Sequence, residues 1–183
     1  MTRTPGPTLT PTPILTDLTT LVIDTAALNA AATLWADPPR NITRDLRELG
    51  GSVCNVMCLG REWTSLSRRD TLVLIMYRTA AFEEAVQAAY SARFVYLARG
   101  FELAPLPSGV SLAAHTWIAS RGDREFVIFT SQGPAVLSMF WHSQQPVPVD
   151  STLASLARYM NVQARNLRLN GYITVNPNAT PLP

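Results

Sequence analysis

The chain contains no lysine: its 15 basic residues are all arginine, set against 13 acidic residues and a formal net charge of +2. Charged residues make up only 15% of the sequence, whereas about a quarter is usual for a soluble protein. So small a net charge argues against the dense basic face of a nucleic-acid-binding protein. Two interpretations of the low charge stay open: a surface rich in Thr, Ala and Pro, or a surface partly buried against a partner.

Long hydrophobic runs are missing as well. The longest uninterrupted apolar stretch is Leu72–Tyr77, far short of the roughly 20 residues of a transmembrane helix. The first residues, Met1–Pro5, lack the apolar core of a signal peptide. We expect the chain as given to be soluble, and a leader or lipid anchor could already have been removed.

The residue patterns of common catalytic and cofactor sites are absent. The sequence has no Gly-x-Ser-x-Gly nucleophile elbow, no Gly-x-Gly-x-x-Gly turn and no phosphate-binding loop. Only two histidines, His115 and His142, are available for acid–base chemistry. We therefore expect a non-enzymatic protein without a cofactor.

Two cysteines, Cys54 and Cys58, are the candidates for a covalent cross-link. In an extended strand their Cα atoms would lie about 13 Å apart, whereas a disulfide needs a separation within about 7 Å. Gly51 and Gly60 flank the pair and allow a tight loop, and one helical turn would bring the two residues to about 6 Å. We expect a Cys54–Cys58 disulfide in an oxidising compartment, with two buried reduced thiols as the alternative.

The same two cysteines and the two histidines have the residue types of a tetrahedral zinc site. Structural zinc sites usually carry their cysteines and histidines in short pairs, and the spacing of Cys54, Cys58, His115 and His142 differs from that pattern. We therefore expect no metal centre.

Proline and threonine dominate both ends of the chain. Four prolines within residues 1–13 remove backbone donors and favour extended polyproline II structure, and residues 176–183 have the same character. Such segments offer little to bury and are typical of linkers. We predict a disordered linker at 1–13, a single globular domain at 14–175 and a disordered tail at 176–183.

The segment Thr71–His142 has the clearest structural pattern. An apolar run at 71–78 is followed by helical periodicity from Thr79 to Arg99, and Gly100 is suited to end that helix. Three more short apolar runs follow, at 115–120, 125–130 and 135–142. Turn residues centred on Gly122 and Gly133 separate these runs and indicate a three-stranded meander.

Another helix is expected to begin near Asp150 or Ser151. The sequence thus predicts an α+β fold with a mainly antiparallel sheet of about four to six strands, in β-α-β-β-β-α order, and with helices packed on one face. In the helix from Thr79 to Arg99, one side is traced by residues at spacings of three and four. They are Phe82, Val86, Ala89, Arg93 and Leu97, widened by Tyr90 and Phe94. We predict that this side of the helix faces the sheet.

Three aromatic residues, Trp117, Phe140 and Trp141, belong to strands that are apolar on both sides. Helices on one face would leave the other face of these strands uncovered, and an open apolar face marks an interface or a ligand groove. Either the segment Asp17–Leu66 or a partner covers it. We favour a partner and predict Trp117, Phe140 and Trp141 as interface residues.

A Thr/Pro-rich spacer joined to a β-α-β-β body resembles small domains of surface lipoproteins from high-GC bacteria. The resemblance implies an extracytoplasmic domain tethered near a membrane, and a cytoplasmic location is the alternative. We expect a non-enzymatic binding or assembly domain, surface-tethered or part of a larger complex, with a protein partner or a second copy. The alternative function is a small-ligand carrier or sensor with an apolar cleft between sheet and helix.

Overall fold

The computed structural model describes residues 21–30, 33–45 and 57–169 of the chain. In this part of the chain seven strands form one antiparallel sheet in the order β1-β2-β3-β7-β6-β5-β4. The strands are β1 (Arg40–Asn41), β2 (Met57–Thr64), β3 (Asp70–Arg78), β4 (Glu102–Ala104), β5 (Trp117–Arg121), β6 (Glu125–Gln132) and β7 (Ala135–Ser143). The helices are α1 (Thr25–Leu28), α3 (Phe82–Ala98) and α4 (Val149–Leu169). The α+β class and the antiparallel sheet are confirmed, although the sheet has seven strands rather than four to six.

Strand β7 is the fourth of the seven strands and lies at the centre of the sheet, paired with β3 on one side and with β6 on the other. Strands β5, β6 and β7 form the predicted meander. Its two turns contain Gly122 and Gly133, whose φ angles of +60° and +55° favour glycine. The short strand β4, paired with β5, was not expected from the sequence.

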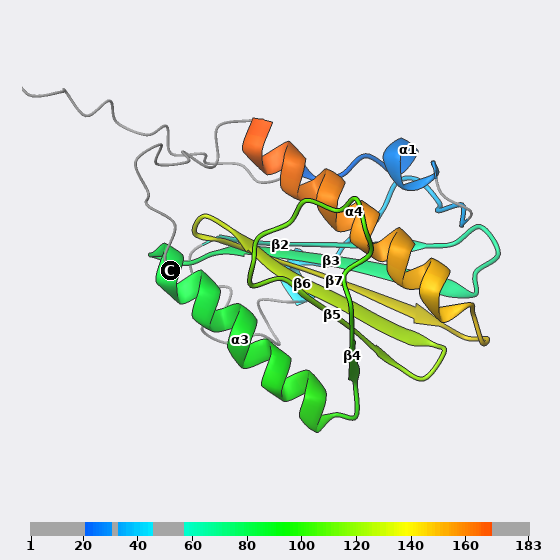
Figure 1. Ribbon diagram of the computed structural model, residues 1–183. Coiled ribbons are helices and arrows are strands. Elements are labelled where there is room, and N and C mark those ends of the chain that lie inside the picture. Colours follow the sequence, from blue (N-terminus) through cyan, green and yellow to red (C-terminus); the bar gives the residue numbers. More distant parts are fainter. Residues whose placement is uncertain (1–20, 31–32, 46–56, 170–183) are drawn as a thin grey trace, which may run out of the picture.

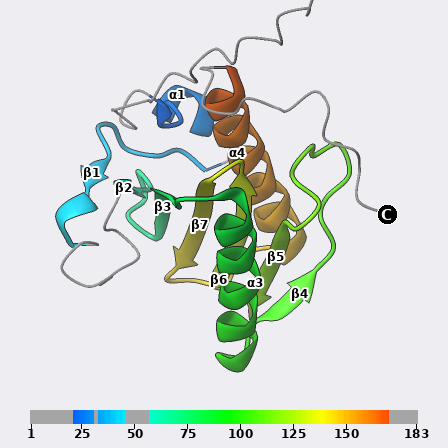
Figure 2. The ribbon, with the colours of Figure 1, turned by 90° about the vertical axis from the view of Figure 1, so that its left-hand side faces the viewer.

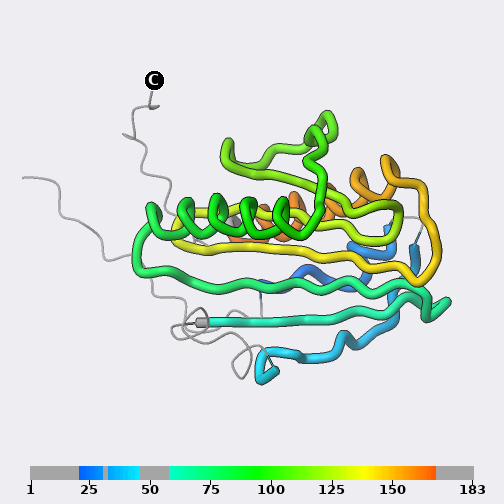
Figure 3. Tube along the Cα trace, turned by 90° about the horizontal axis from the view of Figure 1, so that it is seen from below, coloured from blue at the N-terminus to red at the C-terminus, as the bar shows by residue number. Residues whose placement is uncertain are grey.

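The two long helices lie on opposite faces of the sheet, α4 on one side and α3 on the other (Figures 1 and 2). Figure 3, seen from below, shows α3 in front of the strands and α4 behind them. The prediction that the helices share one face is therefore wrong. The physical reason lies in strands such as β6, where Ile128 faces α4 while its neighbours Val127 and Phe129 face α3.

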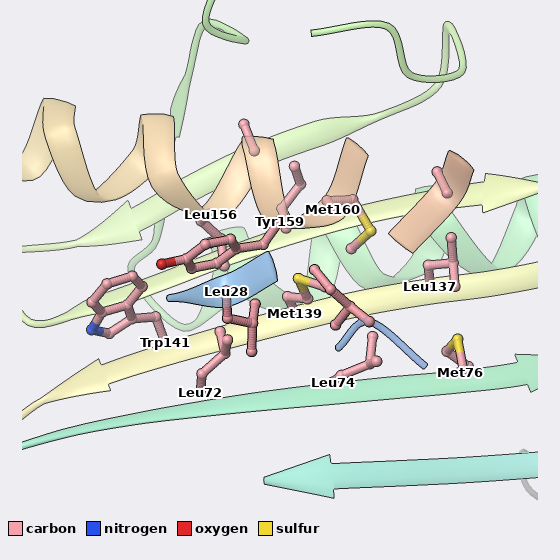
Figure 4. Close-up of a cluster of buried hydrophobic side chains, with 14 of the residues drawn as sticks. Leu28, Leu72, Leu74, Met76, Leu137, Met139, Trp141, Leu156, Tyr159 and Met160 are labelled. Atoms are coloured by element: carbon pink, nitrogen blue, oxygen red, sulfur yellow. The ribbon is translucent and has the colours of Figure 1, made fainter. Parts of the chain in front are cut away.

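The larger core lies between the sheet and α4 (Figure 4). Side chains of β3 and β7, among them Leu74 and Met139, point toward Leu156 and Met160 of α4. All four are fully buried. Helix α4 contributes an apolar stripe at helical spacing to this core, through Leu153, Leu156, Met160 and Ala164.

Polar contacts instead attach the N-terminal segment to this core. The buried side chain of Gln163 accepts a hydrogen bond from the backbone N–H of Ile23 and donates one to the carbonyl of Leu21, each at 2.7 Å. The Trp35 indole donates to the hydroxyl of Tyr159 at 3.3 Å. Its ring also meets Trp141 edge-on, with centroids 5.0 Å apart. This N-terminal segment therefore covers part of the α4 side of the sheet.

The predicted linker at 1–13 and tail at 176–183 lie outside the described residues and stay predictions. Within the described ranges, no helix combines the length and apolar character that a membrane span requires.

The Trp35 contacts give a direct test of this packing. Replacing Trp35, which is 1% exposed, by Ala should lower the free energy of unfolding by about 3–5 kcal/mol, because the change removes a large buried side chain and leaves a cavity. Leu34 is its matched control. It is 51% exposed, so Leu34→Ala should stay within about 0.5 kcal/mol of the wild type. Chemical denaturation measures the free energy of unfolding of both variants. A loss for Trp35→Ala as small as that for Leu34→Ala would show that Trp35 is not part of the core.

Candidate functional site

Helix α3 contacts the sheet through its smallest side chains. Ala85 and Ala89 are fully buried against β5, β6 and β7. The indole of Trp117 on β5 donates a buried hydrogen bond of 2.8 Å to the backbone carbonyl of Ala89. A strand side chain can reach a helix carbonyl only when no bulky side chain stands between them. The contact therefore fixes which side of α3 faces the sheet.

The predicted core side of α3 is therefore wrong. Phe94 is 70% exposed, Phe82 49%, Tyr90 42% and Leu97 37%. Among the residues predicted to face the sheet, only Ala89 is fully buried. Both sides of this helix are apolar, so periodicity alone could not show that the alanines face inward.

The end of α3 shapes the space beside it. Gly100 adopts a φ of +82° and ends the helix, as the sequence predicts. The N–H of Phe101 then returns to the carbonyl of Tyr96 at 3.1 Å. This is the hydrogen bond of a Schellman motif, and its usual apolar contact is present, because the Tyr96 and Phe101 rings meet edge-on at 5.1 Å.

A groove of about 450 Å³ opens between this helix end and the sheet. Its lining consists of Val73, Ile75, Tyr96, Arg99, Phe101, Arg121, Glu125 and Phe140. The strand residues Val73, Ile75 and Phe140 are only partly buried, because α3 lies over β6 and β7 and leaves β3 partly open. The volume lies in the range of about 300–1,000 Å³ that is usual for small-molecule sites.

The charged residues of the groove are unevenly paired. Arg121 forms an ion pair and a hydrogen bond with Glu125, and this contact lowers the pKa of the Glu125 carboxyl, so it stays ionised at neutral pH. Arg121 also donates to the carbonyl of Arg99 at 3.2 Å and lies over the Phe101 ring at 5.3 Å. For Arg99 the structure shows a contact with the Tyr96 ring, 6.0 Å from its centroid, and no carboxylate of the described residues pairs with it.

The three predicted interface residues lie in different places. Trp117 is 6% exposed and belongs to the core under α3, while Trp141 is 3% exposed and belongs to the core under α4. The interface assignment of these two tryptophans is therefore wrong, since helices on opposite faces cover both of them. Phe140 is partly buried and lines the groove.

The predicted disulfide concerns one described residue. Cys58 lies on β2 and is 6% exposed, and no cysteine of the described residues is a free thiol. Cys54 lies outside the described residues, so a Cys54–Cys58 bridge stays a prediction.

The histidines are also separated. The Nε2 atom of His115 lies 2.5 Å from the hydroxyl of Ser131 and accepts a hydrogen bond from the Ser131 backbone N–H at 3.2 Å. Ser131 is only 1% exposed, so a substrate could not reach it as a nucleophile. His142 lies on β7, 3.9 Å from Glu125. Within the described ranges, no three His, Cys, Asp or Glu residues are grouped as a metal would require.

Comparisons with protein-family models, with curated proteins and with solved structures gave no match. The residues that sequence reasoning missed are Tyr96, Arg99 and Phe101. The signal that could have found them is the alanine spacing of α3, which turns Tyr96 toward the sheet together with Ala85 and Ala89.

The buried environment of His115 leads to a pH test. Burial lowers the pKa of His115 below its ordinary value of 6.5, so the unfolded chain binds a proton at this residue more readily than the folded chain does. Its contribution to stability is therefore complete above pH 6.5 and is lost as the pH falls through the lower folded-state pKa.

Thermal unfolding of the wild type and of His115→Gln between pH 7.5 and about pH 5 checks this expectation. The variant should lose less stability on acidification, because glutamine can still accept a hydrogen bond from Ser131 and does not titrate. His142 is present in both proteins and serves as an internal control. Parallel curves for the two proteins would contradict the assignment.

Proposed function

We propose that this chain is a non-enzymatic binding or assembly domain, and that the outer stripe of α3 docks onto a second copy of the chain. The outer stripe consists of Val86, Tyr90, Phe94 and Leu97, which follow one another at spacings of four, four and three residues. The observation that carries the proposal is its exposure. Tyr90, Phe94 and Leu97 are 42%, 70% and 37% exposed while alanines hold the helix to the sheet.

An exposed stripe of this kind favours association. Burying apolar surface is worth about 25 cal/mol for each Å² removed from water, and contiguous apolar patches on soluble proteins commonly mark interaction sites. Helices that pack together need side chains recurring every three or four residues. The outer stripe has this spacing over three turns of α3.

Charge favours a second copy as the occupant. Glu83 and Glu84 lie in the first turn of α3, whereas Arg93 lies toward its other end. If two copies pair α3 against α3 in antiparallel order about a twofold axis, the acidic end of each helix lies level with the basic end of the other. In the same antiparallel pairing the two helix dipoles point in opposite directions, which is the favourable arrangement of two neighbouring helices.

Other features support the remaining parts of the proposal. The Ser131 hydroxyl lies beside His115, as a serine nucleophile and its base would. Because Ser131 is buried, this pair argues against nucleophilic catalysis. The Thr/Pro-rich ends and the predicted Cys54–Cys58 bridge support an extracytoplasmic, surface-tethered setting. This setting is part of the proposal, and a cytoplasmic location is its alternative.

A specific observation also favours a second candidate function, a small-ligand carrier or sensor. The groove beside α3 has an apolar floor between helix and sheet, which is the site that such a protein needs. The groove and the outer stripe lie on different sides of α3, so the two functions are compatible.

The assembly proposal predicts a concentration-dependent dimer in sedimentation velocity experiments. Phe94→Arg should give a monomer at the same concentrations, because it places a charge in the middle of the contact. Its stability should remain within about 0.5 kcal/mol of the wild type, since Phe94 makes little contact with its own chain.

Leu66→Arg is the matched control, because Leu66 is 63% exposed in the turn between β2 and β3, away from α3. This variant should dimerise as the wild type does. A wild-type protein that is monomeric at every concentration, or a Phe94→Arg variant that still dimerises, would show that the outer stripe is not the interface.

A further inference from the structure

We propose that the groove between α3 and β3 binds a small molecule with an apolar body and a single anionic group, and that Arg99 receives the anion. This inference rests on the second candidate function and adds the chemistry of its ligand. It is independent of docking through the outer stripe.

The apolar part of the ligand is indicated by the floor and the wall of the groove. Val73, Ile75 and Phe140 are partly buried within the isolated chain and line an open space. Tyr96 and Phe101 form an aromatic wall, held edge to face by the chain reversal at Gly100. A ligand that covers these side chains removes apolar surface from water without any displacement of α3.

The anionic part is indicated by the balance of charge. The groove has two guanidinium groups and one carboxylate, and Glu125 is already occupied by Arg121. The carbonyl end of α3 adds roughly half a negative charge, and Arg121 already donates to the last of these carbonyls. Burial raises the pKa of the Tyr96 phenol, so this residue stays protonated and adds no charge. The remaining balance is positive and lies at Arg99.

The arrangement also limits what the ligand can be. A cationic ligand would have to compete with Arg121 for Glu125 while lying close to Arg99. A second anionic group on the ligand would find no further cation in the groove except the one that Glu125 neutralises. A single carboxylate-, sulfonate- or phosphate-type group on an apolar ring or chain therefore fits the site best.

The test compares two probes of the same shape, 2-naphthoate and its neutral amide, 2-naphthamide, by isothermal titration calorimetry. The full chain should bind naphthoate about two- to fivefold more tightly than the amide, as expected for one partly solvated ionic contact. Raising the salt concentration should reduce this preference, because the rim of the groove is exposed.

Three variants assign the binding. Arg99→Gln should remove the preference for naphthoate, while Arg93→Gln should keep it, because Arg93 lies on the same helix and is not part of the groove lining. Val73→Phe should weaken both probes by filling the floor. The melting temperature of each variant, measured in parallel, establishes that it is folded.

The outcomes separate this inference from the function on which it rests. Equal binding of the two probes, lost in Val73→Phe, would retain the carrier function and overturn the role of Arg99. Binding of neither probe, or binding that Val73→Phe leaves unchanged, would overturn the ligand site itself. Neither result would bear on the dimer formed through the outer stripe.

Discussion

The hydrogen bond from the Trp117 indole to the carbonyl of Ala89 is the contact on which the orientation of α3, and with it the proposed functional face, depends. It brings a large strand side chain against the backbone of α3, so only alanine-sized side chains fit around Ala89 on that side of the helix. The larger apolar residues of α3 must then lie elsewhere, which accounts for the exposure of Phe94 and Tyr90. The same orientation of α3 about its axis sets Tyr96 beside the sheet. There its ring lies 5.7 Å from that of Trp117 and forms one wall of the groove.

The sheet that carries α3 is packed on its opposite face as well, against α4 and the N-terminal segment. Strands β3, β6 and β7 are apolar on both sides, so each contributes to two cores at once. The α4 side is closed by the helix and by the N-terminal segment, through Gln163 and the contacts of Trp35. Within the described residues, α3 is the helix that covers the other side, and β3 stays partly open there. The α4 side is covered more fully than the α3 side, and this asymmetry is why we propose the α3 side as the functional one.

Much of this architecture could be predicted from the sequence, and the limits are physical. The meander and the end of α3 at Gly100 follow from strong local signals, apolar runs bounded by glycine turns. Strand β2 is harder to predict because Gly60, Arg61 and Glu62 interrupt its apolar pattern. Backbone pairing with β3 stabilises this strand although its local sequence only weakly favours one. The orientation of α3 could not be predicted, because an alanine side and a bulkier apolar side compete for the sheet. The contact with Trp117, 28 positions away in the sequence, decides between them.

The central claim is that the outer stripe of α3 is a contact surface, left exposed by the way alanines pack on the sheet. Oxidative footprinting of the wild-type chain across a range of protein concentrations measures this most directly. Phe94 and Leu66 are similarly exposed in the isolated chain, at 70% and 63%, so both should be oxidised in dilute solution, each at its own intrinsic rate. At high concentration the account predicts that Phe94 and Tyr90 become protected while Leu66 does not. Oxidation of Phe94 and Tyr90 that stays unchanged with concentration, or protection that appears at Leu66 instead, would contradict it.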